Sequence, residues 1–324
     1  MAEYEVSVVL TTYNAEKTLS RAFDSIISQQ TNHSFEVIII DDGSSDDTVS
    51  MIKDYANQYD NVSYFSQENS GPSIARNNGI DHAQGQYILF SDDDDEYLPD
   101  YIEKAMEQVK QNKLVIVGIE KRLQSGEIVK ETHSVLEDAN DNQQMIKGYL
   151  VNNQEFDVGP WNKLFELSVI KQNSLYFMNK IFEDSLFILK YLSLINYDEI
   201  GFVHTPEYIL YKRNGSITNS YEKQLLDRCN EYISDVAEIV QTNQKLPSYF
   251  SSFKARIYLY YVHRNILTNQ SWNGKEQRNF LKSRVSSSSF SDLDNKYRVA
   301  LLLARFMPNL YIKMYRKKMN GDQK

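Results

Sequence analysis

The fold is indicated most clearly by residues 35–52, FEVIIIDDGSSDDTVSMI. The first six residues are β-branched or aromatic except for Glu36, which is typical of a strand covered by helices on both faces. The polar turn at 41–43 ends this run, and the segment 44–48 offers side chains that cap a helix. An apolar stripe with helical spacing then begins at Val49. A strand that leads through a polar turn into a helix is the unit from which parallel α/β sheets are built.

The same alternation extends on both sides of this stretch. We expect strands at residues 6–10, 62–65, 87–90 and 114–119, and helices at 19–27, 49–59, 74–83 and 99–109. After about residue 219 the sequence becomes helical and polar. We therefore predict an α/β fold with a mostly parallel sheet flanked by helices over residues 1–218, and a helical C-terminal region over residues 219–324. That second region is a candidate for acceptor, oligomer or membrane contacts, and a homo-oligomer is one expected form.

The composition excludes several classes of protein. The 324 residues carry 35 basic and 44 acidic side chains, a net charge of −9, which argues against a nucleic-acid binder. A single cysteine, Cys229, permits no internal disulfide and no cysteine-rich zinc site. Residues 1–10 show no signal peptide, and no run of about 18 apolar residues suggests a membrane span. We expect a cytoplasmic protein.

The C-terminal end differs in charge from the rest. Residues 296–324 hold eight Lys or Arg and one acid, a local net charge of +7 that leaves −16 for the remainder. Apolar residues interleave with these cations. One interpretation is peripheral contact with an anionic membrane surface, at the inner face of the membrane. The other is that the apolar positions pack on the protein core and the cations form a solvated face.

Three polar clusters follow expected strands, at residues 11–14, 41–44 and 92–96. In an open parallel sheet the carboxyl ends of the strands form the ligand crevice. The five consecutive carboxylates at 92–96 repel one another, and a divalent cation relieves that repulsion, so Asp92-x-Asp94 predicts a metal-diphosphate site. A solvated acidic turn is the alternative. An EF-hand is excluded because Tyr97 stands where glycine is required, and neither a Walker A loop nor a GxGxxG is present.

Five motifs in order resemble the successive signatures of family 2 inverting glycosyltransferases of bacterial type. Two more extend the resemblance to about residue 217. The motifs are VSVVLTTYN at 6–14, VIIIDDGS at 37–44, ARNNG at 75–79, GQYI at 85–88, DDDD at 92–95, WNKL at 161–164 and FED at 182–184. The resemblance implies a GT-A fold, a nucleotide-diphosphate sugar donor, Mn²⁺ or Mg²⁺ as cofactor, and inversion at the anomeric carbon.

The resemblance also implies roles for the polar residues at the strand ends. Tyr13 would stack on the base, Asp42 would accept a hydrogen bond from it, and Arg76 would help to hold the nucleotide. Asp92 would contact the ribose, and Asp94 would bind the metal. The expected nucleotide-sugar contacts are Thr11, Tyr13, Asp42, Arg76, Asp92 and Asp93. Thr11 replaces the proline common in the family, and the resemblance does not divide the remaining roles between Asp93 and Asp95.

Inverting transfer needs a base that takes the proton of the acceptor hydroxyl. The resemblance assigns this role to Asp184, although spacing alone does not separate it from Glu183, and an acidic pair at a helix start is also a common capping arrangement. Candidate contacts to the acceptor or the diphosphate are Trp161, Lys163, Glu183 and Arg213. For Trp161, a position in the core is the alternative.

The sequence thus predicts a metal-dependent inverting glycosyltransferase. It would move a hexose or N-acetylhexosamine from a UDP-sugar to a hydroxyl of a glycan, polymer or glycoprotein acceptor. The alternative is a catalytically inactive nucleotide-sugar-binding subunit of a glycan assembly complex. A nucleotidyltransferase is a third reading, and the missing glycine-rich phosphate loop argues against it.

Overall fold

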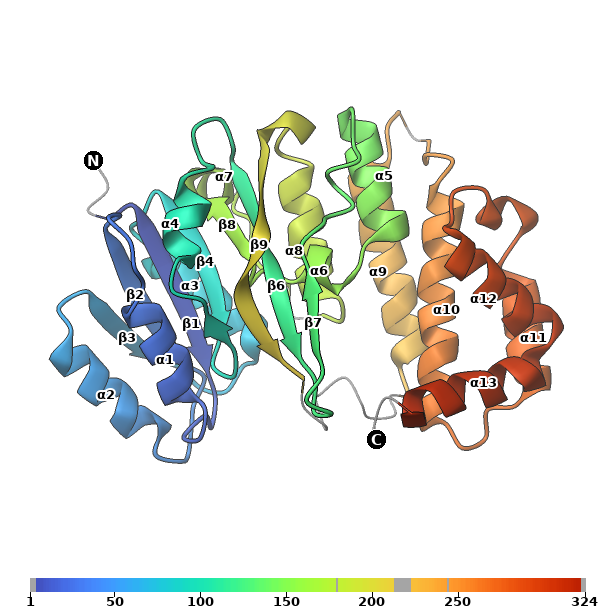
Figure 1. The fold of residues 1–324 in the computed structure, drawn as a ribbon. Helices are drawn as coiled ribbons and strands as arrows, with labels where there is room; N and C mark the ends of the chain where they lie inside the picture. Colours follow the sequence, from blue (N-terminus) through green and yellow to red (C-terminus); the bar gives the residue numbers. More distant parts are fainter. Residues whose placement is uncertain (1–3, 179, 213–222, 244, 322–324) are drawn as a thin grey trace. The chain divides into compact units, whose positions relative to one another are not determined.

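The computed structural model describes residues 4–178, 180–212, 223–243 and 245–321. It divides into two compact units (Figure 1). The first comprises Met1–Met145 and Gln154–Lys212, and the second Ile146–Asn153 and Arg213–Lys324. The expected boundary near residue 219 lies within 213–222, outside the described residues.

The first unit begins with four parallel strands in the order β3-β2-β1-β4. The predicted alternation of strands and helices is confirmed here. The elements are β1 (Val6–Thr12), α1 (Leu19–Ile27), β2 (Phe35–Asp41), α2 (Thr48–Gln58), β3 (Val62–Ser66), α3 (Pro72–His82) and β4 (Tyr87–Asp92). All seven residues of β1 are buried, as expected for a central strand with helices on both faces.

The strands β2 and β3 are added on one side of β1, whereas β4 is added on its other side. Because crossover connections are right-handed, α3 packs on the face opposite to α1 and α2 (Figure 1). Gly79 of α3 makes this packing close, since a Cβ there would lie 2.2 Å from Cγ1 of Val9. The close approach fixes α3 on β1, and Arg76 lies one helical turn before the contact.

The remaining strands of this unit form a mixed sheet that continues from β4 in the order β8-β6-β9-β5, with β7 paired to β6. Among the described strands of this part, β6 and β9 alone are parallel neighbours. The strands are β5 (Glu96–Tyr97), β6 (Leu114–Arg122), β7 (Ile128–Glu131), β8 (Lys163–Glu166) and β9 (Ile200–Tyr211). The helices are α4 (Tyr101–Met106), α6 (Glu155–Val158), α7 (Leu167–Gln172) and α8 (Glu183–Leu192), and α5 (Asn142–Asn152) runs from this unit into the other.

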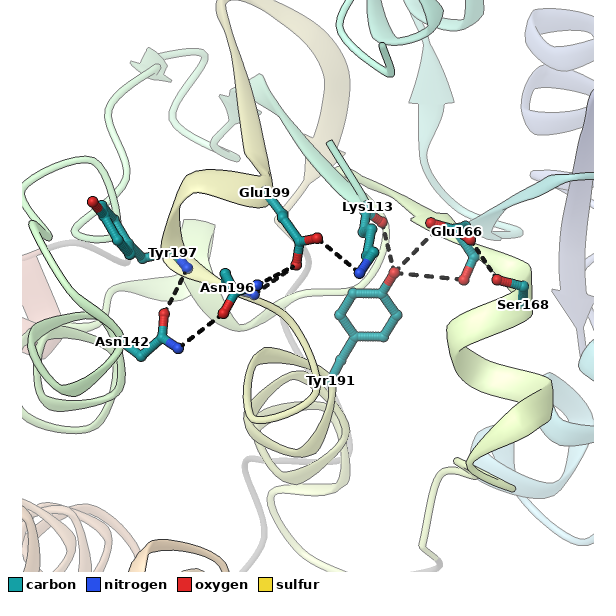
Figure 2. A network of polar contacts seen from close by, with 8 residues as sticks. All are labelled: Lys113, Asn142, Glu166, Ser168, Tyr191, Asn196, Tyr197 and Glu199. Carbon is teal, nitrogen blue, oxygen red and sulfur yellow. Dashed lines mark hydrogen bonds and ion pairs between the residues drawn. The ribbon is translucent and has the colours of Figure 1, made fainter. Parts of the chain in front are cut away.

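A polar network fixes the C-terminal end of α8 on the sheet (Figure 2). The Tyr191 hydroxyl donates to the backbone oxygen of Lys113 at 2.6 Å and accepts from the backbone N–H of Glu166 at 3.1 Å. The Lys113 ammonium pairs with Glu199 at 2.7 Å. The helix is thus tied to the end of β8 and to the residues that precede β6 and β9. This anchoring sets the direction of α8, whose first turn carries Glu183 and Asp184.

The second unit is helical, as predicted for the C-terminal region. Its helices are α9 (Leu225–Val240), α10 (Phe250–Thr268), α11 (Gly274–Arg284), α12 (Asn295–Phe306) and α13 (Pro308–Gly321) (Figure 1). Apolar side chains such as Val236, Phe253 and Val262 form its core, which also encloses Cys229. Among the described residues, no helix combines the length and apolar character that a membrane crossing requires.

Candidate active site

The carboxyl ends of three parallel strands lie side by side in the first unit. Thr12 of β1 is paired with Asp41 of β2, and Thr11 of β1 with Asp92 of β4. The polar clusters that follow these strands therefore meet at one edge of the sheet, as the sequence predicts. Thr11 is buried there, at the end of a strand.

Asp42 organises the loop that precedes α3. One carboxylate oxygen accepts from the Gln67 amide at 2.9 Å and from the Ser70 N–H at 2.8 Å, and the other accepts from the Gly71 N–H at 2.8 Å. The turn at Gly43 is held instead by Asp41, which accepts from the Ser44 N–H at 3.1 Å. Because a carboxylate offers about four acceptor positions, Asp42 retains room for one further donor.

Tyr13 lies next to the acidic run. Its backbone N–H donates to Asp93 at 3.0 Å, while its ring is 49% exposed. Asn14, with a left-handed φ of 50°, accepts from the Ser45 N–H at 2.8 Å and so joins the loop after β1 to the loop after β2. The connection holds the loop that carries the half-exposed Tyr13 at the carboxyl ends of β1 and β2.

The neighbours Asp93 and Asp95 differ in environment. Asp95 is almost fully buried and accepts from the Tyr208 hydroxyl at 2.8 Å and the Tyr211 N–H at 3.0 Å. Burial and the neighbouring carboxylates hold its pKa well above the ordinary value. Asp93 is partly exposed, and burial, with repulsion from Asp94 and Asp92, raises its pKa to about 6. Asp95 thus anchors the turn after β4 to β9, and Asp93 faces the loop after β1.

Arg76 joins two predicted site residues that are far apart in the sequence. Its guanidinium is buried and donates to Asp92 at 2.9 Å and to Asp184 at 2.8 Å. The two carboxylates raise the pKa of Arg76 against the opposing effect of burial, so the side chain carries its charge. The start of α8 is thereby tied to the end of β4 through a residue of α3.

Asp184 lies in the first turn of α8. The residue before this helix, Phe182, has a left-handed φ of 64°, which turns the chain sharply into it. Burial raises the pKa of Asp184 to about 6, with smaller contributions from Glu183 and Asp92, while Arg76 opposes the rise. A carboxylate with such a pKa is largely ionised at neutral pH and accepts a proton more readily than an ordinary aspartate.

Two other predicted contacts lie in the interior. Lys163 is fully buried, and its ammonium donates to the backbone oxygens of Phe156 and Gly159 and to the Asn162 side chain at 2.7–2.9 Å. These three acceptors use all its donors, so Lys163 holds the segment before β8 and is not placed to contact a diphosphate. Trp161 is also buried and stacks on Tyr208 with ring centroids 5.0 Å apart, so it occupies a position in the core. Arg213 lies outside the described residues.

Arg21 of α1 is a neighbour of the site that the sequence analysis missed. Its guanidinium donates to the backbone oxygen of Asp94 and lies 3.9 Å from the ring centroid of Tyr211. It therefore fixes the backbone of the acidic turn against β9. In the sequence, Arg21 lies among the polar positions of an amphipathic helix, and nothing in the residue pattern separates it from an arginine that only faces solvent.

The carboxylates after β4 suit a hard divalent cation. Within the described residues, no group of three His, Cys, Asp or Glu side chains is arranged as a ready metal site. Mg²⁺ and Mn²⁺ sites, however, use one or two protein carboxylates and are completed by water and substrate phosphates. Burial is the main cause of the raised pKa of Asp93, and repulsion from Asp94 and Asp92 adds to it; a cation would relieve that repulsion. These residues therefore fit such an ion.

Comparison with known proteins places these residues within a described family. The model of the family described as "Glycosyl transferase family 2" matches residues 7–172, just over half of the chain. Cholesterol galactosyltransferase of Borreliella burgdorferi is 29% identical over 228 residues, which are 67% of this chain and 63% of that protein. The matches to two further glycosyltransferases cover 22% and 36% of their lengths. The chain thus spans less than two thirds of the length of each of these three relatives.

Two solved structures share the fold. S. aureus TarS, residues 1–349, in complex with UDP-GlcNAc, superposes with a TM-score of 0.64 at 19% identity, over 98% of this chain and 92% of that one. The mannosyltransferase PcManGT from Pyrobaculum calidifontis, in complex with GDP-Man and Mn²⁺, gives a TM-score of 0.51 at 14% identity, over 95% and 87% of the two chains. At these identities the likeness shows the fold alone, and it confirms the predicted GT-A architecture.

Proposed function

This chain belongs to glycosyl transferase family 2, and from that membership we propose that it is an active, metal-dependent, inverting glycosyltransferase. It transfers a hexose or N-acetylhexosamine from a UDP-sugar to a hydroxyl of a glycan, polymer or glycoprotein. The observation that carries the proposal is the position of Arg76, whose guanidinium holds Asp184 beside Asp92 at the end of β4.

In this proposal Asp184 is the general base. An acceptor hydroxyl must lose its proton as it attacks the anomeric carbon, and the base must be ionised to take that proton. Asp184 meets this condition at neutral pH because its pKa is about 6. Its pairing with Arg76 fixes the carboxylate near the crevice. Glu183, its neighbour in the first turn of α8, provides the matched residue for a test.

The donor nucleotide would lie over the ends of β1 and β2. The exposed ring of Tyr13 offers a face for stacking, and Asp42 has an acceptor position left for the imide N–H of uracil. The complex of TarS with UDP-GlcNAc supports UDP as the nucleotide for a chain of this fold.

The diphosphate would meet the acidic turn after β4. Asp94, with Asp92 or Asp93, would hold Mn²⁺ or Mg²⁺, and the complex of PcManGT with Mn²⁺ supports this choice of ion. When bound, the cation supplies positive charge that stabilises the departing diphosphate. Arg21 keeps the backbone of this turn in place through its hydrogen bond to the Asp94 oxygen.

Incubation of the protein with Mn²⁺ and a panel of nucleotide sugars tests the proposal. We expect release of free UDP from one of the UDP-hexoses or UDP-N-acetylhexosamines, and faster release when the acceptor is present. A binding subunit would release no nucleotide, and a nucleotidyltransferase would release pyrophosphate. Either result would overturn the proposal.

A further inference from the structure

Two consecutive helices of the second unit present large apolar side chains to solvent. On α12 these are Val299, Leu302 and Phe306, which recur at the spacing of one helix face, and Phe306 is 61% exposed. The series continues with Met307, Leu310 and Met314 in and before α13. The two stripes meet at Phe306-Met307. Contiguous exposed apolar residues of this kind mark a surface that another partner covers.

The opposite side of α13 is fixed on the core of its unit. Tyr311 and Ile312 are buried, and the Tyr311 hydroxyl lies 2.6 Å from Nε2 of His263 on α10. Arg316 donates to the backbone oxygen of Ile266, also on α10, at 3.0 Å. The packing interpretation of the C-terminal apolar residues therefore holds for this side of the helix, and the face that carries Leu310 points away from the core.

Lysines share the outward face of α13. Lys313 and Lys317 follow Leu310 and Met314 by three residues, and Lys318 follows Met314 by four, so they lie beside these apolar side chains on the helix surface. All three are exposed. From residue 295 to residue 321 the chain has seven Lys or Arg and no Asp or Glu. The outward face of α13 thus carries apolar side chains with lysines beside them.

From this arrangement we propose that the outward face of α12 and α13 docks on an anionic lipid bilayer. A bilayer offers both features that the surface matches, an acyl region for the apolar side chains and negative headgroups for the lysines. A second copy of the same face would bring two sets of positive charges together, which repels. The net charge of −16 outside residues 296–324 disfavours any other part of the chain as the contact with an anionic surface.

Co-sedimentation of the full chain with lipid vesicles tests the proposal. We expect binding to phosphatidylcholine vesicles that contain about 30% phosphatidylglycerol, little binding to pure phosphatidylcholine, and loss of binding at about 1 M salt, where charges are screened beyond about 3 Å. Each basic residue near such a surface contributes roughly five-fold to binding. The triple variant Lys313→Gln, Lys317→Gln, Lys318→Gln should therefore bind about 100-fold more weakly. The double variant Phe306→Ser, Leu310→Ser should lose at least about ten-fold.

Matched variants separate this face from a general effect of charge or apolar area. The exposed lysines Lys53, Lys275 and Lys282, changed to glutamine together, should leave vesicle binding intact, as should Leu246→Ser, an exposed apolar residue of the same unit. Equal binding to neutral and anionic vesicles, no binding at all, or equal losses in the matched variants would overturn the proposal. So would a dimer in analytical ultracentrifugation that the double variant abolishes, because a second copy would then cover the face. No sugar donor is present, so the outcome is independent of glycosyl transfer.

Discussion

Arg76 donates to Asp184 at 2.8 Å, although the two residues are 108 positions apart in the sequence. The same guanidinium is 2.9 Å from Asp92, so one cation compensates two carboxylates, one at the end of β4 and one in the first turn of α8. The desolvated guanidinium is stable because both partners are present. We infer that the pair forms part of the folded structure before any donor binds, and that it presents Asp184 in one position for the acceptor.

Replacement of Asp184 by asparagine should remove the base and preserve the shape of the side chain. We expect the rate of transfer at saturating substrates to fall by about 10²–10⁴-fold, with little change in the affinity for UDP, because Asp42 and Tyr13 are untouched. Single-turnover rates and a UDP binding titration measure the two effects. Glu183→Gln is the matched control and should retain most of the activity. Full activity in Asp184→Asn would exclude Asp184 as the base.

The pKa of Asp184 also predicts a pH dependence. Burial raises it to about 6, so the fraction of ionised base increases as the pH rises through that value. We expect the transfer rate at saturating donor, acceptor and Mn²⁺ to be low near pH 5, to increase about ten-fold per unit below the pKa, and to level off near pH 7. The profile is measured with the wild type in overlapping buffers. A rate that stays constant from pH 5 to pH 7 contradicts a base with this pKa.

Asp94→Ala should weaken the dependence of donor binding on the metal. The substitution removes one of the few protein carboxylates expected on the ion, while the backbone oxygen that accepts from Arg21 stays. We expect the affinity for UDP in the presence of Mn²⁺ to fall at least about ten-fold, and the affinity without Mn²⁺ to stay the same. Calorimetric titration with and without the ion measures both. Asp60→Ala, an exposed acid elsewhere in the unit, serves as the control, and an unchanged Mn²⁺ effect in Asp94→Ala would contradict the assignment.

Arg76→Met should destabilise the protein as well as inactivate it. The change leaves Asp92 and Asp184 close together with no cation between them, a loss that we place at about 3 kcal/mol of unfolding free energy. Denaturant unfolding measures this loss. Arg76→Lys keeps the charge without the planar fork and should recover only part of the stability. Wild-type stability in Arg76→Met would show that the two carboxylates find other partners.

The sequence predicted those parts of the fold and the site that depend on local pattern. The strands β1, β2 and β4 have continuous apolar runs, and their polar ends could be assigned to one edge of the sheet from topology alone. Two short strands, β5 and β8, were missed. These strands are two and four residues long, too short to show a periodic apolar pattern. The strand β8 forms because of its neighbours in the sheet, since Phe165 pairs with both Ile88 and Leu114.

Within the site, the sequence could not distinguish neighbours of the same residue type. Asp93 and Asp95 are both aspartates of one acidic run, and only the path of β9 decides that Asp95 is the buried one. The WNKL motif was likewise taken as a source of contacts to the substrate. Its tryptophan and lysine are instead buried against α6, which directly precedes the motif, and β9, which lies about 40 residues further along the chain.

Lys163 provides a last prediction, because burial lowers its pKa to about 7, well below that of a lysine in the unfolded chain. Between pH 7 and pH 10 the unfolded state then binds more protons at this residue than the folded state, so its contribution to stability rises with pH. Lys163→Met removes the titrating group, and with it the hydrogen bonds to Phe156 and Gly159.

We therefore expect the wild type to gain stability over Lys163→Met as the pH rises from 7 to 10, as measured by urea unfolding of both proteins in the same buffers. The subtraction cancels the tyrosines and other lysines that titrate in this range. Lys171→Met, which removes an exposed lysine that donates to the backbone oxygen of Ala83, is the matched control for the loss of a lysine hydrogen bond. A difference for Lys163→Met that does not change with pH would mean that its three oxygen acceptors keep the ammonium charged in the folded state throughout this range.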